Sequence, residues 1–229
     1  MKSLSLVVPA RNSCHVIKPF LRGYYKVFSE KFFPFELIVV CNGCTDNTKD
    51  ICSSLTSEFP LKVMDIPKKG KGRALVAGFN IARNEILGFL DADNPFNLDE
   101  VKKMIDLLES YDVVIASKYK KGRARSQDSQ FRRLISLGGA VVSLTLFNLR
   151  LTDTQAGAKF FRRRVWDSID RDFICHNFDF DIEFLYKVGK KGFSIREFYI
   201  PFQYRKFSTV SLRYLPGMLK RLLMLRLLK

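Results

Sequence analysis

The chain has few acidic residues for its many basic ones, and the shortage is greatest in its second half. Its 229 residues include 39 Lys and Arg against 23 Asp and Glu, which gives a formal net charge of +16. No Asp or Glu follows Glu197, whereas seven Lys and Arg do, and Lys118 to Arg133 holds seven basic residues against Asp128 alone. Such a balance favours anionic partners: nucleic acid, phosphorylated substrates or membrane headgroups.

Histidine and cysteine are also scarce. The chain has two His, His15 and His176, and five Cys, an odd number that does not read as a disulfide framework and favours a reducing, intracellular compartment. Cys41 and Cys44 have the spacing of a redox or zinc motif, but no second Cys pair or His pair accompanies them. This argues against a zinc site.

Long hydrophobic runs are missing as well. The longest uncharged candidate, Leu134 to Leu149, has 16 residues, fewer than the roughly 20 that a transmembrane helix needs. The segment 131–149 is therefore expected to be either a buried core helix or a helix lying against lipid. The hydrophobic fraction of 47% excludes disorder, and the length fits one domain with or without an appendage.

Short apolar, β-branched runs alternate with longer helical stretches over the first half of the chain. This alternation predicts an α/β fold with a mostly parallel sheet. The expected strands are Leu4 to Val8, Phe35 to Val40, Leu61 to Ile66, Ile86 to Leu90 and Asp112 to Ala116. The expected helices are Val16 to Lys31, Thr45 to Ser57, Gly72 to Arg83 and Leu98 to Ser110.

Two motifs at the expected carboxyl ends of strands carry chemistry, and this edge is where open α/β sheets bind ligands. Asp91 and Asp93 directly follow the run Ile86 to Leu90. On extended backbone, side chains two apart point to the same side, so both carboxylates could converge on one hard cation. The segment Gly70-Lys71-Gly72-Arg73 precedes a helix and offers two cations, which predicts a diphosphate cradle.

With these motifs in place, the sequence resembles the family-two glycosyltransferases of GT-A fold, a Rossmann-like sheet flanked by helices. The matching segments are Leu6 to Asn12, Ile38 to Thr48, Gly70 to Ala74 and Phe89 to Asp93. Later segments look like the subgroup that loads glucose or mannose onto dolichyl or polyprenyl phosphate. These are Ser117 to Tyr119, Phe131 to Ser136, Asp153 to Phe160 and Phe178 to Glu183.

The resemblance implies a role for individual positions. Asp91 and Asp93 would place Mg²⁺ or Mn²⁺ on the donor diphosphate, and Asp153 and Gln155 would lie near the transferred sugar. The implied donor-binding residues are Pro9, Ala10, Arg11, Asn12, Asn42, Lys71, Arg73, Asp91 and Arg205, with Asn42 facing the base. The implied acceptor-phosphate residues are Lys118, Arg132 and Ser136. A solvated basic face is the alternative explanation for Lys118, Arg132 and Arg205.

The chain departs from the family pattern in three places. Many members have Asp-Asp where this chain has Cys41-Asn42, and an Asn can donate as well as accept, so the preferred base is less constrained. Pro95 stands where some mannosyl members have a Gln metal ligand, and Thr209 stands where a Lys is frequent.

The C-terminal segment combines leucine with basic residues. Six Leu and two Met between Met218 and Leu228 are interrupted only by Lys220, Arg221 and Arg226. This predicts a catalytic domain over residues 1–212 and a basic amphipathic helix over 213–229, which either lies on an anionic membrane surface or packs on the core. With the resemblance, it places the protein at the cytoplasmic face of a membrane.

The sequence thus favours a metal-dependent, inverting transfer of glucose or mannose from a nucleotide sugar to a polyprenyl phosphate. Three alternatives stay open at this point. The same fold could act on a glycan or protein hydroxyl, the chain could be a nucleotidyltransferase, or it could be a noncatalytic basic module. No nucleic-acid recognition motif is present, so nucleic acid is not an expected partner.

Overall fold

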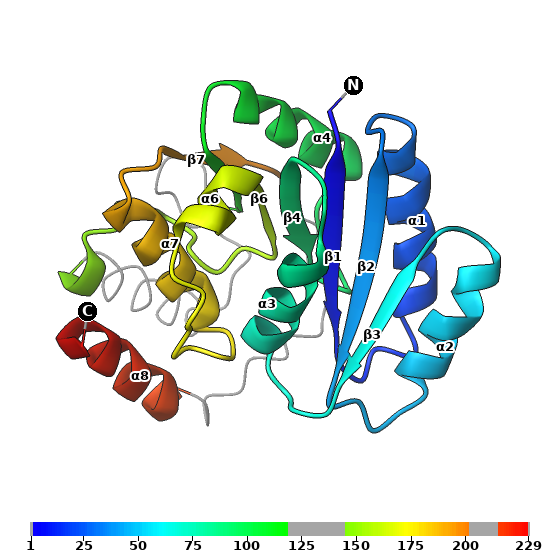
Figure 1. Ribbon diagram of the computed structural model, residues 1–229, viewed down its shortest axis with the longest axis horizontal. Helices are drawn as coiled ribbons and strands as arrows, with labels where there is room; N and C mark the ends of the chain where they lie inside the picture. The colour runs from blue at the N-terminus through cyan, green and yellow to red at the C-terminus, as the bar shows by residue number, and fades with distance from the viewer. Residues whose placement is uncertain (1, 119–144, 202–214, 229) are drawn as a thin grey trace.

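The computed structural model describes residues 2–118, 145–201 and 215–228. Within them the chain forms a seven-stranded sheet in the order β3-β2-β1-β4-β6-β5-β7 (Figure 1). The strands are β1 (Leu4–Ala10), β2 (Phe35–Asn42), β3 (Lys62–Ile66), β4 (Ile86–Leu90), β5 (Val113–Ser117), β6 (Ala158–Arg162) and β7 (Ile195–Tyr199).

The prediction of a mostly parallel sheet is confirmed. Strand β1 pairs in parallel with β2 and β4, β2 with β3, and β5 with β7. Strand β6 runs antiparallel between β4 and β5. All five strands expected from apolar runs are present, with ends that differ from the expected ones by at most two residues. Strands β6 and β7 were not expected.

The helices divide between the two faces of the sheet. They are α1 (Ile17–Ser29), α2 (Thr48–Ser54), α3 (Lys71–Ile81), α4 (Leu98–Asp106), α6 (Arg163–Ser168), α7 (Phe180–Lys190) and α8 (Leu215–Leu228), with short 3-10 turns η1 (Leu55–Ser57) and η2 (Leu107–Glu109). Four of them lie where the sequence predicts helices, although α3 begins at Lys71 rather than Gly72.

Two hydrophobic cores result from the alternation of side chains along the strands. In β1, Leu4, Leu6 and Val8 pack in the core that includes residues of α1, α2 and α4. Val7 points to the opposite face and packs in the core that includes residues of α3, α6, α7 and α8. Figure 1 shows α1 and α2 on one side of the sheet and α3, α6 and α7 on the other.

Helix α8 carries two apolar stripes rather than one. Met218, Leu222 and Leu225 are buried against the second core, whereas Leu219, Leu223 and Leu227 are 46%, 45% and 84% exposed. The basic residues lie between these stripes, so the helix is not simply amphipathic, and both expected roles for it keep a structural basis. Within the described ranges, no helix has the length and apolarity needed to cross a bilayer. Most of segment 131–149 lies outside those ranges.

Candidate active site

Asp91 occupies the carboxyl end of β4 and is fixed through its backbone. Its N–H donates to the carbonyl oxygen of Gly157 at 3.0 Å, which extends the pairing of β4 with β6 by one step. Its own carbonyl oxygen accepts from the Tyr24 hydroxyl at 2.7 Å and from the Asn94 N–H at 3.1 Å. The half-buried carboxylate is thus placed at the edge where the parallel strands end.

The segment after β4 differs from the extended backbone assumed from the sequence. The Asn94 N–H bond to the Asp91 carbonyl closes a turn, and Ala92 and Asp93 lie within it. Asp93 is exposed. The two carboxylates are therefore close in sequence at one turn, but strand alternation does not set their directions.

Gly157 leaves room for the Asp91 side chain. An ideal Cβ at position 157 would lie 2.2 Å from Asp91 Oδ2 and 2.7 Å from its Cγ. Any larger residue would displace the carboxylate, because its Cβ would overlap these side-chain atoms. Gly157 thereby sets where Asp91 points.

A chain of four alternating charges leads from Asp91 into the protein. Lys71 Nζ lies 2.9 Å from Asp91 Oδ1 and 3.6 Å from Asp181 Oδ2, and Lys159 Nζ lies 2.6 Å from Asp181 Oδ1. Lys159 and Asp181 are 0% and 1% exposed. Lys159 also donates to the Ala156 carbonyl at 2.9 Å, so this buried ammonium is well satisfied. The formal charges of the four groups cancel.

The ring of Phe89 supports both ammonium groups. Lys71 Nζ and Lys159 Nζ lie 4.7 and 5.2 Å from its centroid, within the range of cation–π attraction. Burial alone lowers the pKa of Lys71, but Asp181 and Asp91 outweigh it and hold that pKa above its usual value. For Lys159 burial prevails, and its pKa is lowered despite Asp181.

Asp153 is a second buried carboxylate near the four charged residues Asp91, Lys71, Asp181 and Lys159. It is 7% exposed, and its Oδ2 accepts from the Lys118 N–H at 3.4 Å. Burial raises the pKa of Asp153, while the charges of Lys118 and Lys159 act in the opposite direction. Glu197 Oε1 in β7 accepts from the Asp153 N–H at 2.9 Å and fixes the backbone there. The structure therefore brings the predicted residues Asp153 and Lys118 together.

Asn42 ties three loops to one another at the end of β2. It is 3% exposed; its Nδ2 donates to the Ala10 carbonyl at 2.8 Å, and its Oδ1 accepts from the Gly70 N–H at 3.1 Å. A carboxylate could accept from Gly70 but could not donate to Ala10. This bridge is a structural reason for Asn where many relatives have Asp. Its contact with the base stays a prediction.

Four further donor-binding positions, residues 9–12, lie at one of the loops that this bridge joins. Pro9 and Ala10 are buried at the end of β1, and Arg11 and Asn12 are exposed beyond it. Asn12 adopts φ 49° and its Oδ1 accepts from the Thr45 N–H at 2.9 Å, which joins the two loops.

Gln155 is exposed and its Nε2 donates to the Phe178 carbonyl at 3.4 Å. Arg132, Ser136 and Arg205 lie outside the described residues.

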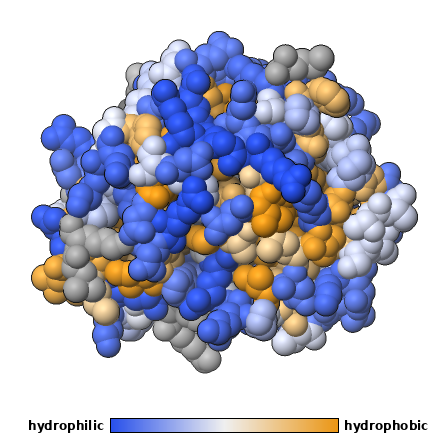
Figure 2. All heavy atoms as spheres, in the orientation of Figure 1, coloured by the Kyte–Doolittle hydropathy of each residue, from blue (hydrophilic) through white to orange (hydrophobic). Residues whose placement is uncertain are grey.

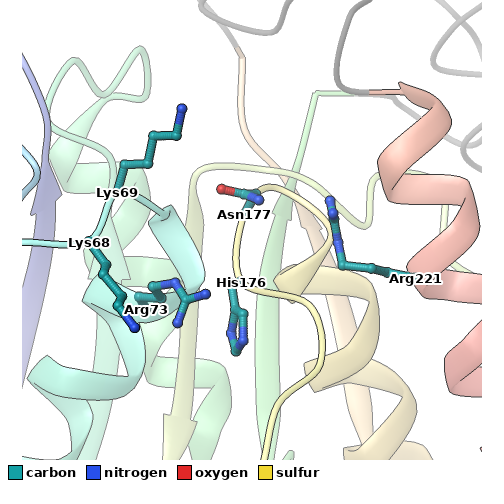
Figure 3. Close-up of a pocket in the computed structure, with 6 residues that line it drawn as sticks. All are labelled: Lys68, Lys69, Arg73, His176, Asn177 and Arg221. Carbon is teal, nitrogen blue, oxygen red and sulfur yellow. The ribbon is translucent and has the colours of Figure 1, made fainter.

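Lys71 and Arg73 do not share one site, although the sequence suggests a common diphosphate cradle. Helix α3 begins at Lys71, and two residues along a helix correspond to a rotation of about 200° around its axis, so their side chains lie on nearly opposite faces. Lys71 reaches Asp91, whereas Arg73 lines a cavity of about 380 Å³ with Lys68, Lys69, His176, Asn177 and Arg221 (Figure 3). The expected cradle is thus divided between two places.

Asp91 and Asp93 suit a metal that arrives with a phosphorylated ligand. Among the described residues, no three His, Cys, Asp or Glu side chains are grouped as a complete metal site. Mg²⁺ is commonly bound by one or two carboxylates while substrate phosphates supply further ligands. Two carboxylates at one turn are the ligand type that this mode uses, and the role of Asp91 and Asp93 as metal ligands stays a prediction.

Sequence reasoning missed four residues that build this site: Tyr24, Gly157 as a packing partner, Lys159 and Asp181. Lys159 and Asp181 each stand beside apolar residues, but their segments, Ala158–Arg162 and Phe180–Lys190, also hold other charged residues, so no local signal marks these two positions as buried. A charge at such a position needs a buried partner. Which residue is the partner depends on the fold.

Comparison with protein families gives a match over most of the chain. The family described as Glycosyl transferase family 2 matches residues 5–188. A glycosyltransferase from Haloferax volcanii, AglD, is 26% identical over 216 residues, covering 91% of this chain and 34% of its own length. The chain thus spans about a third of that relative.

Two relatives that are named as transferases acting on a lipid phosphate match this chain over a larger share of their own length. A dolichyl-phosphate beta-glucosyltransferase from Trichomonas vaginalis, ALG5A, is 26% identical and the match covers 95% of this chain and 70% of that protein. An undecaprenyl-phosphate mannosyltransferase from Micrococcus luteus is 27% identical, with coverage of 76% and 74%. The resemblance inferred from the motifs is confirmed.

Solved structures show the same fold. Glucosyl-3-phosphoglycerate synthase from Mycobacterium tuberculosis superimposes with a TM-score of 0.73 at 19% identity, covering 99% of this chain and 80% of that one. Another structure of that enzyme, in complex with Mn²⁺, uridine diphosphate and phosphoglyceric acid, gives a TM-score of 0.69 at 20% identity. The expected GT-A architecture is confirmed.

Proposed function

The chain belongs to glycosyl transferase family 2, and from that premise we propose that it transfers glucose or mannose from a nucleotide-diphosphate sugar to a polyprenyl or dolichyl phosphate. The observation that carries the proposal is Asp91, a carboxylate fixed at the carboxyl end of β4 beside the cationic Lys71. The names of the Trichomonas and Micrococcus relatives support the lipid phosphate as acceptor.

The donor would bind with its diphosphate near Asp91. Asp91 and Asp93 would hold Mg²⁺ or Mn²⁺, which supplies charge neutralisation for the departing nucleoside diphosphate. Lys71 is a permanent cation at this position, because Asp181 and Asp91 keep it protonated. It stabilises negative charge that develops on the leaving oxygen. The loops joined by Asn42 would receive the nucleoside.

The acceptor would approach from the side of Asp153 and Lys118. A phosphate monoester with a second pKa near ~6 is largely dianionic at neutral pH and needs no general base. Lys118 would hold that phosphate, as would Arg132 and Ser136. Attack opposite the leaving group inverts the anomeric carbon, so an α-linked nucleotide sugar would give a β-linked lipid product.

A second candidate is transfer to a hydroxyl, which the burial of Asp153 favours. A hydroxyl nucleophile needs a general base, and burial raises the pKa of Asp153 and so makes its carboxylate more basic. Replacing Asp153 with Asn separates the candidates. Transfer to a phosphate should change less than about tenfold, whereas transfer to a hydroxyl should fall at least about a hundredfold.

Helix α8 would attach the enzyme to a membrane surface. The exposed stripe of Leu219, Leu223 and Leu227 is flanked on the helix surface by Lys220 and Arg226, which suits an anionic bilayer. Figure 2 shows hydrophobic atoms at the lower left, where α8 lies in Figure 1. Leu219→Gln with Leu223→Gln should reduce cosedimentation with anionic vesicles. Unchanged binding would contradict this role.

The direct test is transfer of labelled sugar from UDP-glucose, UDP-N-acetylglucosamine and GDP-mannose to polyprenyl phosphate in detergent, followed by organic extraction. We expect label in the organic phase that depends on Mg²⁺ or Mn²⁺ and falls about a thousandfold in Asp91→Asn. Asp50→Asn, an exposed carboxylate on α2, is the control. Retained activity in Asp91→Asn would refute the role of Asp91. Label that stays in water for every donor would refute the lipid acceptor.

A further inference from the structure

Lys71 binds a carboxylate oxygen of Asp91 that a divalent cation at this position would also use. Its Nζ lies 2.9 Å from Asp91 Oδ1. The second oxygen, Oδ2, lies against Gly157, where an ideal Cβ would come within 2.2 Å of it. A divalent cation that binds Oδ1 therefore competes with Lys71 for one atom, and a cation that binds Oδ2 shares the carboxylate with Lys71.

Two cations on this one carboxylate would repel each other. The Lys71 side chain is 10% exposed and that of Asp91 is 32% exposed, so water screens this pair less than it screens charges on the open surface. The ring of Phe89 adds a cation–π contact, with Lys71 Nζ 4.7 Å from the ring centroid. Lys71 is thus well held at Asp91, and a divalent cation that binds alone has to displace it.

Asp181 gives Lys71 a partner that does not depend on Asp91. Asp181 Oδ2 lies 3.6 Å from Lys71 Nζ, and Asp181 Oδ1 binds Lys159 Nζ at 2.6 Å. Asp181 lies in α7 and is 1% exposed, so its carboxylate is fixed in the interior. Because this carboxylate remains beside it, Lys71 can leave Asp91 without becoming an unpaired buried charge.

A lysine is suited to such an exchange of partners. Its ammonium group carries several donors at the end of a flexible chain, and it binds phosphate oxygens as well as carboxylates. Lys71 is the first residue of α3, so its side chain starts at the end of a helix that favours anions. A diphosphate that reaches this edge of the sheet would therefore offer Lys71 a replacement for Asp91.

We propose that Lys71 is an exchangeable counter-ion of Asp91, which opposes a divalent cation that arrives alone and turns to the donor diphosphate when cation and nucleotide bind together. Asp181 acts as a positioning residue, because it keeps Lys71 beside Asp91 throughout the exchange. The inference rests on the proposed function, which places the diphosphate and the cation at Asp91. It adds that cation and nucleotide strengthen each other's binding by the same factor, and that Lys71 sets much of that factor.

The test measures the binding of Mn²⁺ and UDP to the full chain rather than sugar transfer. Mn²⁺ is titrated into the protein with and without UDP, and the unbound ion is measured by electron paramagnetic resonance, with correction for the complex of Mn²⁺ with UDP. The variant is Lys71→Met. Its matched control is Lys49→Met, which also removes a lysine whose Nζ lies 2.9 Å from a carboxylate oxygen, in that case Asp65 Oδ2 at the surface. Circular dichroism checks the fold of each variant.

In the wild-type protein, UDP should strengthen Mn²⁺ binding about a hundredfold, a coupling within the usual range for linked sites. Lys71→Met should bind Mn²⁺ alone about tenfold more tightly, because the competing ammonium group is gone, and UDP should then strengthen Mn²⁺ binding only about tenfold. Without Mn²⁺, Lys71→Met should bind UDP severalfold more weakly, because it lacks a cation for the diphosphate. Lys49→Met should stay within about twofold of wild type in every measurement.

Three results would overturn the proposal. Mn²⁺ affinity that is unchanged or weaker in Lys71→Met, measured without UDP, would show that Lys71 does not oppose the cation. Equal strengthening in Lys49→Met would assign the effect to the overall charge. Equal Mn²⁺ affinity of the wild-type protein with and without UDP would remove the coupling, and this measurement needs no variant.

Asp91→Asn separates these failures from a failure of the proposed function. If Asp91→Asn loses Mn²⁺ binding while one of the three results is found, the metal site of the proposed function stands and the role of Lys71 is refuted. Mn²⁺ binding that is unchanged in Asp91→Asn would refute the metal site and the role of Lys71 together.

Discussion

Two groups of residues at the start of α3 differ in how the positive charge of their Lys and Arg side chains is balanced. On one side, Lys71 is enclosed with Lys159, Asp91 and Asp181, and the four charges cancel. On the other side, Arg73 joins a cavity to which no described carboxylate contributes. The excess of basic residues over the whole chain does not distinguish these regions.

The difference shows what each kind of site can do. Buried, paired charges hold a fixed geometry, because separating them would leave an uncompensated charge in the interior. Exposed, unpaired cations contribute little to folding and stay available for a ligand. We call the group of Asp91, Lys71, Asp181 and Lys159 the paired side, and the cations that line the cavity the open side. We therefore expect substitutions on the paired side to lower stability and substitutions on the open side to weaken binding.

The largest loss of stability should come from breaking the buried pair. Asp181→Asn leaves Lys159 buried without a full counter-charge, and we expect the free energy of unfolding to fall by about 3–5 kcal/mol in urea denaturation. Asp167→Asn, which breaks the exposed pair with Arg171, should cost less than about 1 kcal/mol. Adding Lys159→Met to Asp181→Asn should recover much of the loss. Equal effects of Asp181→Asn and Asp167→Asn would remove the distinction.

The next test uses the two cations of the same helix turn. Lys71→Met removes a partner of both Asp91 and Asp181 and should lower the free energy of unfolding by about 2 kcal/mol, less than Asp181→Asn because Lys159 still neutralises Asp181. Arg73→Met should change it by less than about 0.5 kcal/mol. Denaturant midpoints at neutral pH measure both. A larger loss in Arg73→Met would show that the open side supports the fold.

Gly157 tests how tightly the paired side is packed. Gly157→Ala should cost about 1–2 kcal/mol, since the added methyl group meets Asp91 Oδ2, and it should also reduce sugar transfer by displacing that carboxylate. Gly23→Ala in α1 is the control, because an ideal Cβ at that position would lie 4.0 Å from Leu98 Cδ1, an ordinary van der Waals contact. That variant should be neutral or slightly stabilising. Full activity in Gly157→Ala would show that Asp91 can shift without consequence.

The smallest expected effect concerns pH. Burial raises the folded-state pKa of Asp153 above its unfolded value, so this residue favours the folded state at low pH, and the contribution is lost as pH rises through the folded pKa. Asp153→Asn should therefore raise the melting temperature at neutral pH by about 2 °C, with the difference shrinking toward about pH 4. Melting curves of Asp153→Asn and Asp50→Asn across this range measure it. A pH-independent loss in Asp153→Asn would contradict burial of the carboxylate as the cause.

The first half of the fold could be read from the sequence because its signals are local. The strands from β1 to β5 are apolar runs between helical stretches, and α1 and α4 each bury one face. Strand β6 and helix α7 lack such signals. Every residue from Phe180 to Val188 is buried, so α7 has no exposed polar face over these residues that would reveal its period.

The site was predictable in its composition but not in its connections. Asp91, Lys71, Asp153 and Lys118 were all expected, and the structure brings Asp91 to Lys71 and Asp153 to Lys118. The partners Asp181 and Lys159, and the bridge through Asn42, depend on contacts between distant segments. The roles of these residues in binding and catalysis stay predictions, which substitutions at Asp91, Asp153 and Gly157 would test.

The reversed direction of β6 has a consequence for how this fold can vary. Because β6 runs against β4, its first residues meet the last residues of β4, and the pairing of Leu90 with Ala158 sets Gly157 against Asp91. This juxtaposition is fixed by strand register and not by the length of chain between Ser117 and Gly157. Related proteins could therefore lengthen, shorten or replace that connection to suit a new acceptor while Asp91 keeps its place.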